Sequence, residues 1–141
     1  MSLAVYFLVD GQAVGKGRPR VSTIAGRPRL YTPAKTVQWE EQVAAAARAA
    51  MGSQEPSGHP MAVSIQIRCQ IPQSWSKKRQ TAARLGHEMP GKPDLDNVAK
   101  AVLDACNGII YKDDKQVIRL TVKKFFNDTA TTEIYTHEVI D

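Results

Sequence analysis

The sequence has little of several features that would place it in a specialised class of protein. Its 141 residues include only two cysteines, Cys69 and Cys106, which lie far apart and form no CxxC pair. This spacing excludes a zinc knuckle and favours free thiols. No apolar run approaches the roughly 20 residues that a membrane-spanning helix needs. The opening MSLAVYFLVDG has no basic segment before its short apolar stretch, so we expect no signal peptide and a cytoplasmic protein.

Acidic residues are fewer than basic residues, and the two kinds are separated along the chain. The 14 Asp and Glu residues stand against 19 Lys and Arg residues, which gives a net charge of +5. Basic residues gather in segments 16–29 and 77–84, whereas acidic residues gather in segment 94–114. A basic surface around a local acidic group suits a polyanion that is held against bound divalent cations. An ordinary solvated basic surface is the alternative.

The hydrophobic pattern predicts four strands and up to three helices. Apolar runs or alternations predict strands in residues 4–9, 61–71, 115–126 and 131–140, with Ile118, Leu120 and Val122 facing inward in the third. Helical spacing predicts one helix from a Thr32-Pro33 start to Gly52, a short basic helix from Ser76 to about Leu85, and a helix from Pro93 to a cap at Gly108.

These elements predict one compact domain over residues 1–141. Segment 11–33 is rich in Gly, Pro and Arg and is expected to be mainly a loop before the first helix. The chain is long enough for one hydrophobic core and too short for two ordinary domains. The expected fold class is therefore α+β, with a mixed β-sheet and two or three helices.

The stretch KPDLDNVAK combines two carboxylates and a lysine at the start of a predicted helix. Asp96 and Lys100 are four residues apart and lie side by side, away from the apolar stripe, and Asp94 stands at the helix start. One interpretation is structural: Asp94 caps the helix and Asp96 pairs with Lys100. The other is that the three residues form one wall of a metal site.

A second acidic stretch, YKDDKQV, follows the same helix and favours the metal site. If the chain returns antiparallel to the helix, Asp113 and Asp114 approach Asp94 and Asp96, and three or four carboxylates repel one another unless a cation is bound. Oxygen ligands without a nearby His or Cys favour Mg²⁺ or Mn²⁺. Such an ion activates water and neutralises charge in phosphodiester hydrolysis, while a lysine beside it binds the phosphate or protonates the leaving group.

Several motifs together resemble the RusA family of Holliday junction resolvases. In order, from about residue 5 to residue 125, they are GKGRPR, YTPAKTVQWEEQV, SWSKKRQ, KPDLDNVAKAVLDACNG and YKDDKQV. The resemblance implies a small homodimeric, Mg²⁺-dependent endonuclease that cuts four-way DNA junctions in DNA recombination and repair. It also implies catalytic roles for Asp94, Asp96, Asp114 and Lys100, with Asp113 as a further metal-ligand candidate beside Asp114.

Basic and polar residues outside the acidic stretches are candidates for DNA contact. Lys16, Arg18 and Arg20 lie in a segment too polar to bury, where contact with phosphate is the preferred interpretation. Further candidates are Lys77, Lys78 and Arg79 in the short basic helix, and Asn97, which could instead cap its helix. Because a four-way junction is cut at two symmetry-related positions and one chain has one acidic cluster, we also expect a two-fold dimer.

Two other functions compete with this prediction. Pro93-Asp94 followed by Asp113-Asp114-Lys115 satisfies the loose PD…(D/E)xK pattern of another class of Mg²⁺ nuclease, although there the acidic residues lie on a strand pair. The chain could also be a non-enzymatic nucleic-acid-binding module in which the acidic residues are caps and ion-pair partners.

Overall fold

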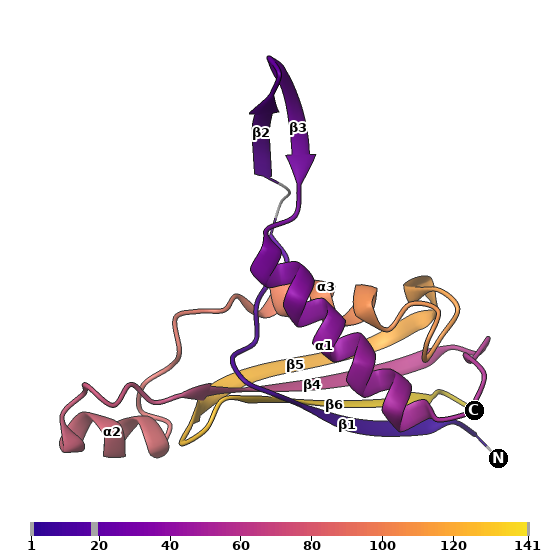
Figure 1. Ribbon diagram of the computed structural model, residues 1–141. Helices are drawn as coiled ribbons and strands as arrows, with labels where there is room; N and C mark the ends of the chain where they lie inside the picture. The colour runs from indigo at the N-terminus through magenta and orange to yellow at the C-terminus, as the bar shows by residue number, and fades with distance from the viewer. Residues whose placement is uncertain (1, 18–19, 141) are drawn as a thin grey trace.

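A four-stranded mixed sheet forms the centre of the computed structural model, which describes residues 2–17 and 20–140 (Figure 1). The strands are β1 (Ala4–Asp10), β4 (Met61–Gln70), β5 (Val117–Asn127) and β6 (Thr131–Glu138), in the order β1-β6-β4-β5. β6 pairs antiparallel with β1 and β4, whereas β4 and β5 are parallel. The chain therefore has the predicted α+β fold with a mixed sheet.

Two helices, α1 (Ala34–Met51) and α3 (Leu95–Ala105), cover the same side of this sheet (Figure 1). Alternation along each strand sends one set of side chains toward the helices, because successive residues of a strand point to opposite faces. The resulting core contains Val5, Phe7 and Val9 of β1, Ile65 and Ile67 of β4, Ile134 of β6, Trp39, Val43 and Ala47 of α1, and Val98 and Val102 of α3. A third helix, α2 (Lys77–Arg84), lies at one end of the sheet (Figure 1).

The helix ends follow the predicted signals closely, with two differences. α1 starts one residue later than predicted, because Pro33, with φ −55° and ψ 143°, is its N-cap in place of Thr32. Its end at Gly52 is confirmed, as is the Ser76 cap of α2, whose side chain accepts a hydrogen bond from the Arg79 N–H. The C-cap of α3 is Cys106, two residues before the predicted cap at Gly108.

The predicted loop in segment 11–33 contains a β-hairpin that the sequence analysis missed. β2 (Arg20–Ile24) pairs antiparallel with β3 (Arg27–Tyr31), and the hairpin projects away from the sheet beside the start of α1 (Figure 1). Ala25 and Gly26 connect the strands with φ angles of 53° and 76°. Two-residue turns with positive φ at both positions match the twist of the strands in a hairpin. The Ala25-Gly26 pair was therefore the sequence feature that could have predicted this hairpin.

The prediction that Ile118 and Leu120 face inward is wrong. These side chains are 63% and 44% exposed, because β5 is an edge strand of the sheet and the helices leave this part of it uncovered. Val122, further along β5, does pack against the core. Leu120 lies instead beside a cavity next to α3.

The two cysteines are free, as the sequence predicts, and both are buried. Burial raises the pKa of the Cys106 thiol to about 12, so this thiol stays protonated and unreactive near neutral pH. Within the described residues, no helix is both long enough and apolar enough to span a bilayer.

Candidate active site

The start of α3 is fixed by contacts from strand β5 and from the loop after β1. The ammonium of Lys124 donates to the carbonyl oxygens of Gly91 and Pro93 at 2.9 and 3.1 Å. The loop after β1 reaches the first turn of α3, where the Lys16 N–H donates to the Asn97 carbonyl at 2.9 Å. These contacts hold the segment that carries Asp94 and Asp96 against β5.

Close packing of Gly15 accounts for a glycine in this loop. A Cβ atom added at Gly15 would lie 2.7 Å from the Cβ atom of Asn97, which is too short for two real side chains. Glycine is the residue that permits such an approach of backbone to a neighbouring element. Gly15, the first residue of GKGRPR, is therefore required for packing on α3, whatever contacts the rest of this segment makes with DNA.

A cavity of about 310 Å³ between α3 and β5 brings together three of the four predicted catalytic residues, and Asp94 is not among the residues that line it. Asp96 and Lys100 reach it from α3, and Asp114 reaches it from a short 3₁₀ turn, Asp114–Gln116, that leads into β5. Asp104 also lines the cavity, and Ala99, Leu103 and Leu120 form its apolar wall. The predicted return of the chain toward the helix thus places Asp114 in the same cavity as Asp96 and Lys100.

The carboxylates at the start of α3 are not used for the structural roles considered above. Asp94 is the N-cap residue, but its side chain makes no capping hydrogen bond; it accepts one long bond, of 3.4 Å, from the Asn97 amide. In the described part of the chain no ion pair joins Asp96 to Lys100, although the two lie one helical turn apart. The structure therefore does not support the cap and ion-pair interpretation, and these charges are free for a ligand.

Asp113 and Asp114 have different environments. The Asp113 carboxylate accepts the Lys115 N–H at 2.9 Å, while the Asp113 N–H donates to the side chain of Gln116 at 2.9 Å. This reciprocal pair is a capping box that stabilises the turn. Asp113 thus holds the turn, and its neighbour Asp114 lines the cavity.

The donor set of the cavity fits a hard divalent cation, although the described residues contain no preformed cluster. Nowhere in residues 2–17 and 20–140 are three or more His, Cys, Asp or Glu side chains arranged to hold a metal ion. The expected convergence of three or four carboxylates is therefore not present in this structure. Mg²⁺ uses one or two carboxylates together with water and substrate phosphate, and the Asp96 and Asp114 carboxylates are ligands of that type.

The Lys16 ammonium ties α1 to α3 at the edge of this cavity. It lies 3.1 Å from a carboxylate oxygen of Glu40 and 3.0 Å from one of Asp104. Burial alone would lower the pKa of Lys16, but the hydrogen bonds that its ammonium donates to Asp104 and Glu40, with their negative charges, outweigh burial and raise the pKa. Asp104 therefore shares the Lys16 cation with Glu40, whereas Asp96 and Asp114 have no ion-pair partner among the described residues.

The other candidate DNA contacts fall into three groups. Arg18 lies outside the described residues, as does the side chain of Arg20, whose backbone belongs to β2. Lys77 and Lys78 are exposed on α2. Arg79 is engaged within the protein: its guanidinium stacks 3.5 Å from the centre of the Trp75 ring and pairs with Glu88.

Comparison with known proteins identifies the family. The family model described as "Endodeoxyribonuclease RusA" matches residues 10–136. This chain belongs to the RusA family of endodeoxyribonucleases. It is therefore an enzyme that hydrolyses phosphodiester bonds in DNA, a nuclease of the Holliday junction resolvase class that binds branched DNA. The chain is also 36% identical over 138 residues to the uncharacterized protein YqaN of Bacillus subtilis (strain 168), with 96% of each chain covered.

Family membership confirms the resemblance seen in the sequence and removes the two competing functions. In this RusA-family protein Asp94 precedes a helix and Lys115 lies in a 3₁₀ turn, whereas the PD…(D/E)xK pattern requires acidic residues on a strand pair. The non-enzymatic interpretation fails because the family is one of nucleases.

Sequence analysis missed the residues that position the site. Asp104 is visible in the sequence as the next member of the row of Asp96 and Lys100, but its ion pair with Lys16 is not. The contacts of Lys124 and Gly15 have no signal in the sequence, because they depend on which elements become neighbours in the folded chain.

Replacing Lys16 with methionine tests whether this residue supports the fold. The change leaves the partly buried carboxylates of Glu40 and Asp104 without their cation, so we expect a loss of about 1 kcal/mol in the free energy of unfolding. Urea denaturation measures it, with Lys78→Met on the exposed face of α2 as the control. Unchanged stability together with weaker DNA binding would instead make Lys16 a phosphate contact.

Proposed function

We propose that this RusA-family enzyme is a homodimer that resolves four-way DNA junctions by paired, Mg²⁺-dependent hydrolysis. The observation that carries the proposal is the cavity between α3 and β5, where Asp96, Lys100 and Asp114 meet without ion-pair partners among the described residues. Two carboxylates and a lysine that line one cavity without internal partners are available to bind a cation and a phosphate.

Asp96 and Asp114 would hold the metal ion, with Asp94 beside them at the start of the same helix. Mn²⁺ is expected to substitute for Mg²⁺, because both prefer carboxylate, water and phosphate oxygens. When bound, the ion would neutralise charge on the phosphate and lower the pKa of a bound water. Because Asp96 comes from α3 and Asp114 from the 3₁₀ turn, the ion would be held from two sides of the cavity.

Lys100 would act on the reacting phosphodiester itself. Its ammonium enters the cavity one helical turn from Asp96, where it can bind a phosphate oxygen or donate a proton to the leaving oxygen. Ala99, Leu103 and Leu120 form the apolar wall beside this charge.

DNA would be held mainly by basic residues outside the cavity. The projecting hairpin, residues 20–31, contains three arginines and no acidic residue, and Arg27 and Arg29 are exposed on it. Lys77 and Lys78 form a second exposed basic site on α2. Contacts of this kind supply affinity for the DNA backbone and make it dependent on salt concentration.

The proposed dimer follows from the symmetry of the substrate. Two strands must be cut at symmetry-related positions, and each chain contributes one catalytic cavity. The sheet face opposite α1 and α3 has apolar side chains available for a contact between subunits, since Tyr6, Leu8 and Tyr135 are about half exposed there.

The metal-ligand assignment is tested by replacing neighbouring aspartates with asparagine. Asp96→Asn and Asp114→Asn should reduce junction cleavage in Mg²⁺ by more than about 100-fold, because each removes a charge that would hold the ion. Binding of the junction should persist, because it depends on Lys and Arg. Asp113→Asn is the matched control and should still cleave, since asparagine also caps turns well. An inactive Asp113→Asn with an active Asp114→Asn would reverse the assignment.

Lys100→Met separates a catalytic lysine from a surface lysine. We expect an unchanged melting temperature and a loss of cleavage of about 100-fold or more, because an exposed helix lysine contributes only a few tenths of a kcal/mol to stability. Lys115→Met serves as the control and should retain activity. Full activity of Lys100→Met would show that the ammonium takes no part in the reaction.

The oligomeric state is tested by size-exclusion chromatography with light scattering. At micromolar concentration the protein should have twice its chain mass of 15.5 kDa. Leu8→Glu, on the open face of the sheet, should shift the protein toward the monomer and slow paired cleavage. A wild-type protein that stays monomeric on a junction, yet cuts both strands together, would contradict the dimer.

A further inference from the structure

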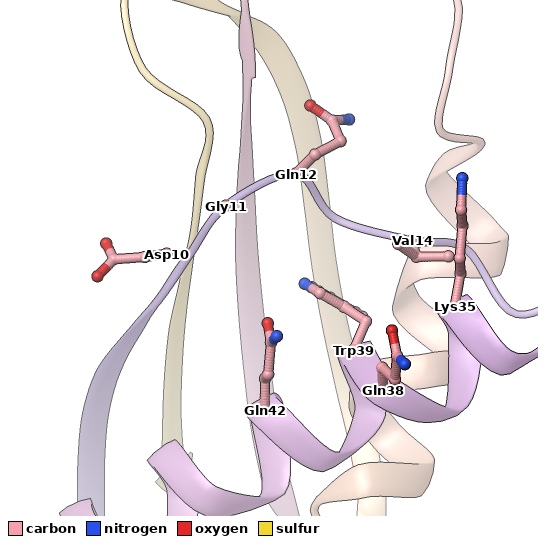
Figure 2. Close-up of a pocket in the computed structure, with 8 residues that line it drawn as sticks. All are labelled: Asp10, Gly11, Gln12, Val14, Lys35, Gln38, Trp39 and Gln42. Atoms are coloured by element: carbon pink, nitrogen blue, oxygen red, sulfur yellow. The ribbon is translucent and has the colours of Figure 1, made fainter.

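A second cavity, of about 250 Å³, lies between the end of β1 and the first half of α1. Gly11 and Gln12 form one side of it, and Lys35, Gln38, Trp39 and Gln42 of α1 form the other (Figure 2). It shares no lining residue with the catalytic cavity. The proposed catalytic residues therefore give this second cavity no role.

Trp39 presents an unused hydrogen-bond donor to this cavity. The residue is 3% exposed, and within the described structure its indole Nε1–H has no hydrogen-bond partner. The nitrogen end of the ring points toward the Gly11–Gln12 segment on the opposite side of the cavity (Figure 2). A buried N–H without a partner is unfavourable, so an acceptor that enters the cavity gains a bond at little cost to the protein.

The rim adds polar groups that are also unused. Lys35, Gln38 and Gln42 lie on one face of α1, all three are exposed, and none makes a side-chain hydrogen bond to the described residues. The Asp10 carboxylate points away from them (Figure 2). The cavity thus offers one fixed donor, two amides that both donate and accept, and a cation at its edge. This set suits a neutral planar group with donors and acceptors that is attached to an anion, as a nucleobase is attached to its phosphate.

The loop that lines the cavity leads directly to the catalytic helix. Gly15, three residues after Gln12, packs against Asn97, the neighbour of Asp96. Three residues span at most about 11 Å even when fully extended. The Gln12 backbone therefore lies within that distance of the contact between Gly15 and the catalytic helix.

We propose that the cavity under the Gly11–Gln12 segment receives an unstacked base of the strand being cut, close to the scissile phosphate. Trp39 donates to an acceptor of the base, Gln38 and Gln42 contact its edge, and Lys35 contacts the adjoining phosphate. The proposal rests on the proposed function, because it takes branched DNA as the ligand. Bases near a junction are less firmly stacked than those in a duplex, which lowers the cost of moving one into a pocket.

An abasic scan tests the proposal. Four-way junctions that carry a single abasic nucleotide at each position around the cut are compared in single-turnover cleavage with Mg²⁺. The wild type should be slowed about tenfold by an abasic nucleotide at one position, because the contacts to that base are lost. The Gln38→Ala/Gln42→Ala variant should be slower on the intact junction and insensitive at that position.

The control variant is Gln54→Ala, which removes a glutamine just after α1 and outside the cavity. It should retain the wild-type abasic profile. If the double variant also retains that profile, or if no position affects the wild type, the cavity does not bind a base. If the wild type cuts no junction at all, the proposed function fails instead, and the cavity is then tested by binding alone.

Binding is read from the two tryptophan indole N–H resonances, assigned with Trp75→Phe. In an Asp96→Asn background, a short single-stranded oligonucleotide should shift the Trp39 indole resonance. An oligonucleotide of the same length made of abasic nucleotides should not. Equal shifts with both would show that the cavity binds the DNA backbone, and no shift with either would show that it holds only water; both results overturn the proposal.

Discussion

The ion pairs of Lys16 hold together the two helices on which the catalytic cavity depends. The Lys16 ammonium contacts Glu40 on α1 and Asp104 near the end of α3. The backbone N–H of the same residue donates to the Asn97 carbonyl near the start of α3. A single residue therefore fixes the helix near both of its ends. Because α3 carries Asp96 and Lys100, the direction of these two side chains relative to β5 depends on this contact.

The same arrangement explains why the site keeps unpaired charges. Asp104 and Asp113 have partners within the protein, the first with Lys16 and the second with the turn it caps. Asp96, Asp114 and Lys100 line the cavity without such partners among the described residues. Asp104 and Asp113 thus stabilise the fold, whereas Asp96 and Asp114 remain accessible to a ligand. The proposed binding of a cation and a phosphate requires such accessible charges.

Sequence alone predicted much of the fold, because its main elements carry strong local patterns. The alternation in β4 and the Ser76 start of α2 were readable without a structure. The exposure of Ile118 and Leu120 was not, since an edge strand and a central strand have the same alternation. For the site, the spacing of Asp96 and Lys100 was local information, whereas the different environments of Asp113 and Asp114 depend on a capping box and on the packing of α3 beside β5.

The central claim is that Asp96 and Asp114 hold the catalytic metal ion, and paramagnetic broadening by Mn²⁺ tests it most directly. Backbone amide resonances are followed while substoichiometric Mn²⁺ is added to the protein in the absence of DNA. The claim predicts that the signals of Asp96, Lys100 and Asp114 broaden first, and that Asp96→Asn removes the effect. Broadening centred elsewhere in the chain, or unchanged in Asp96→Asn, would contradict it.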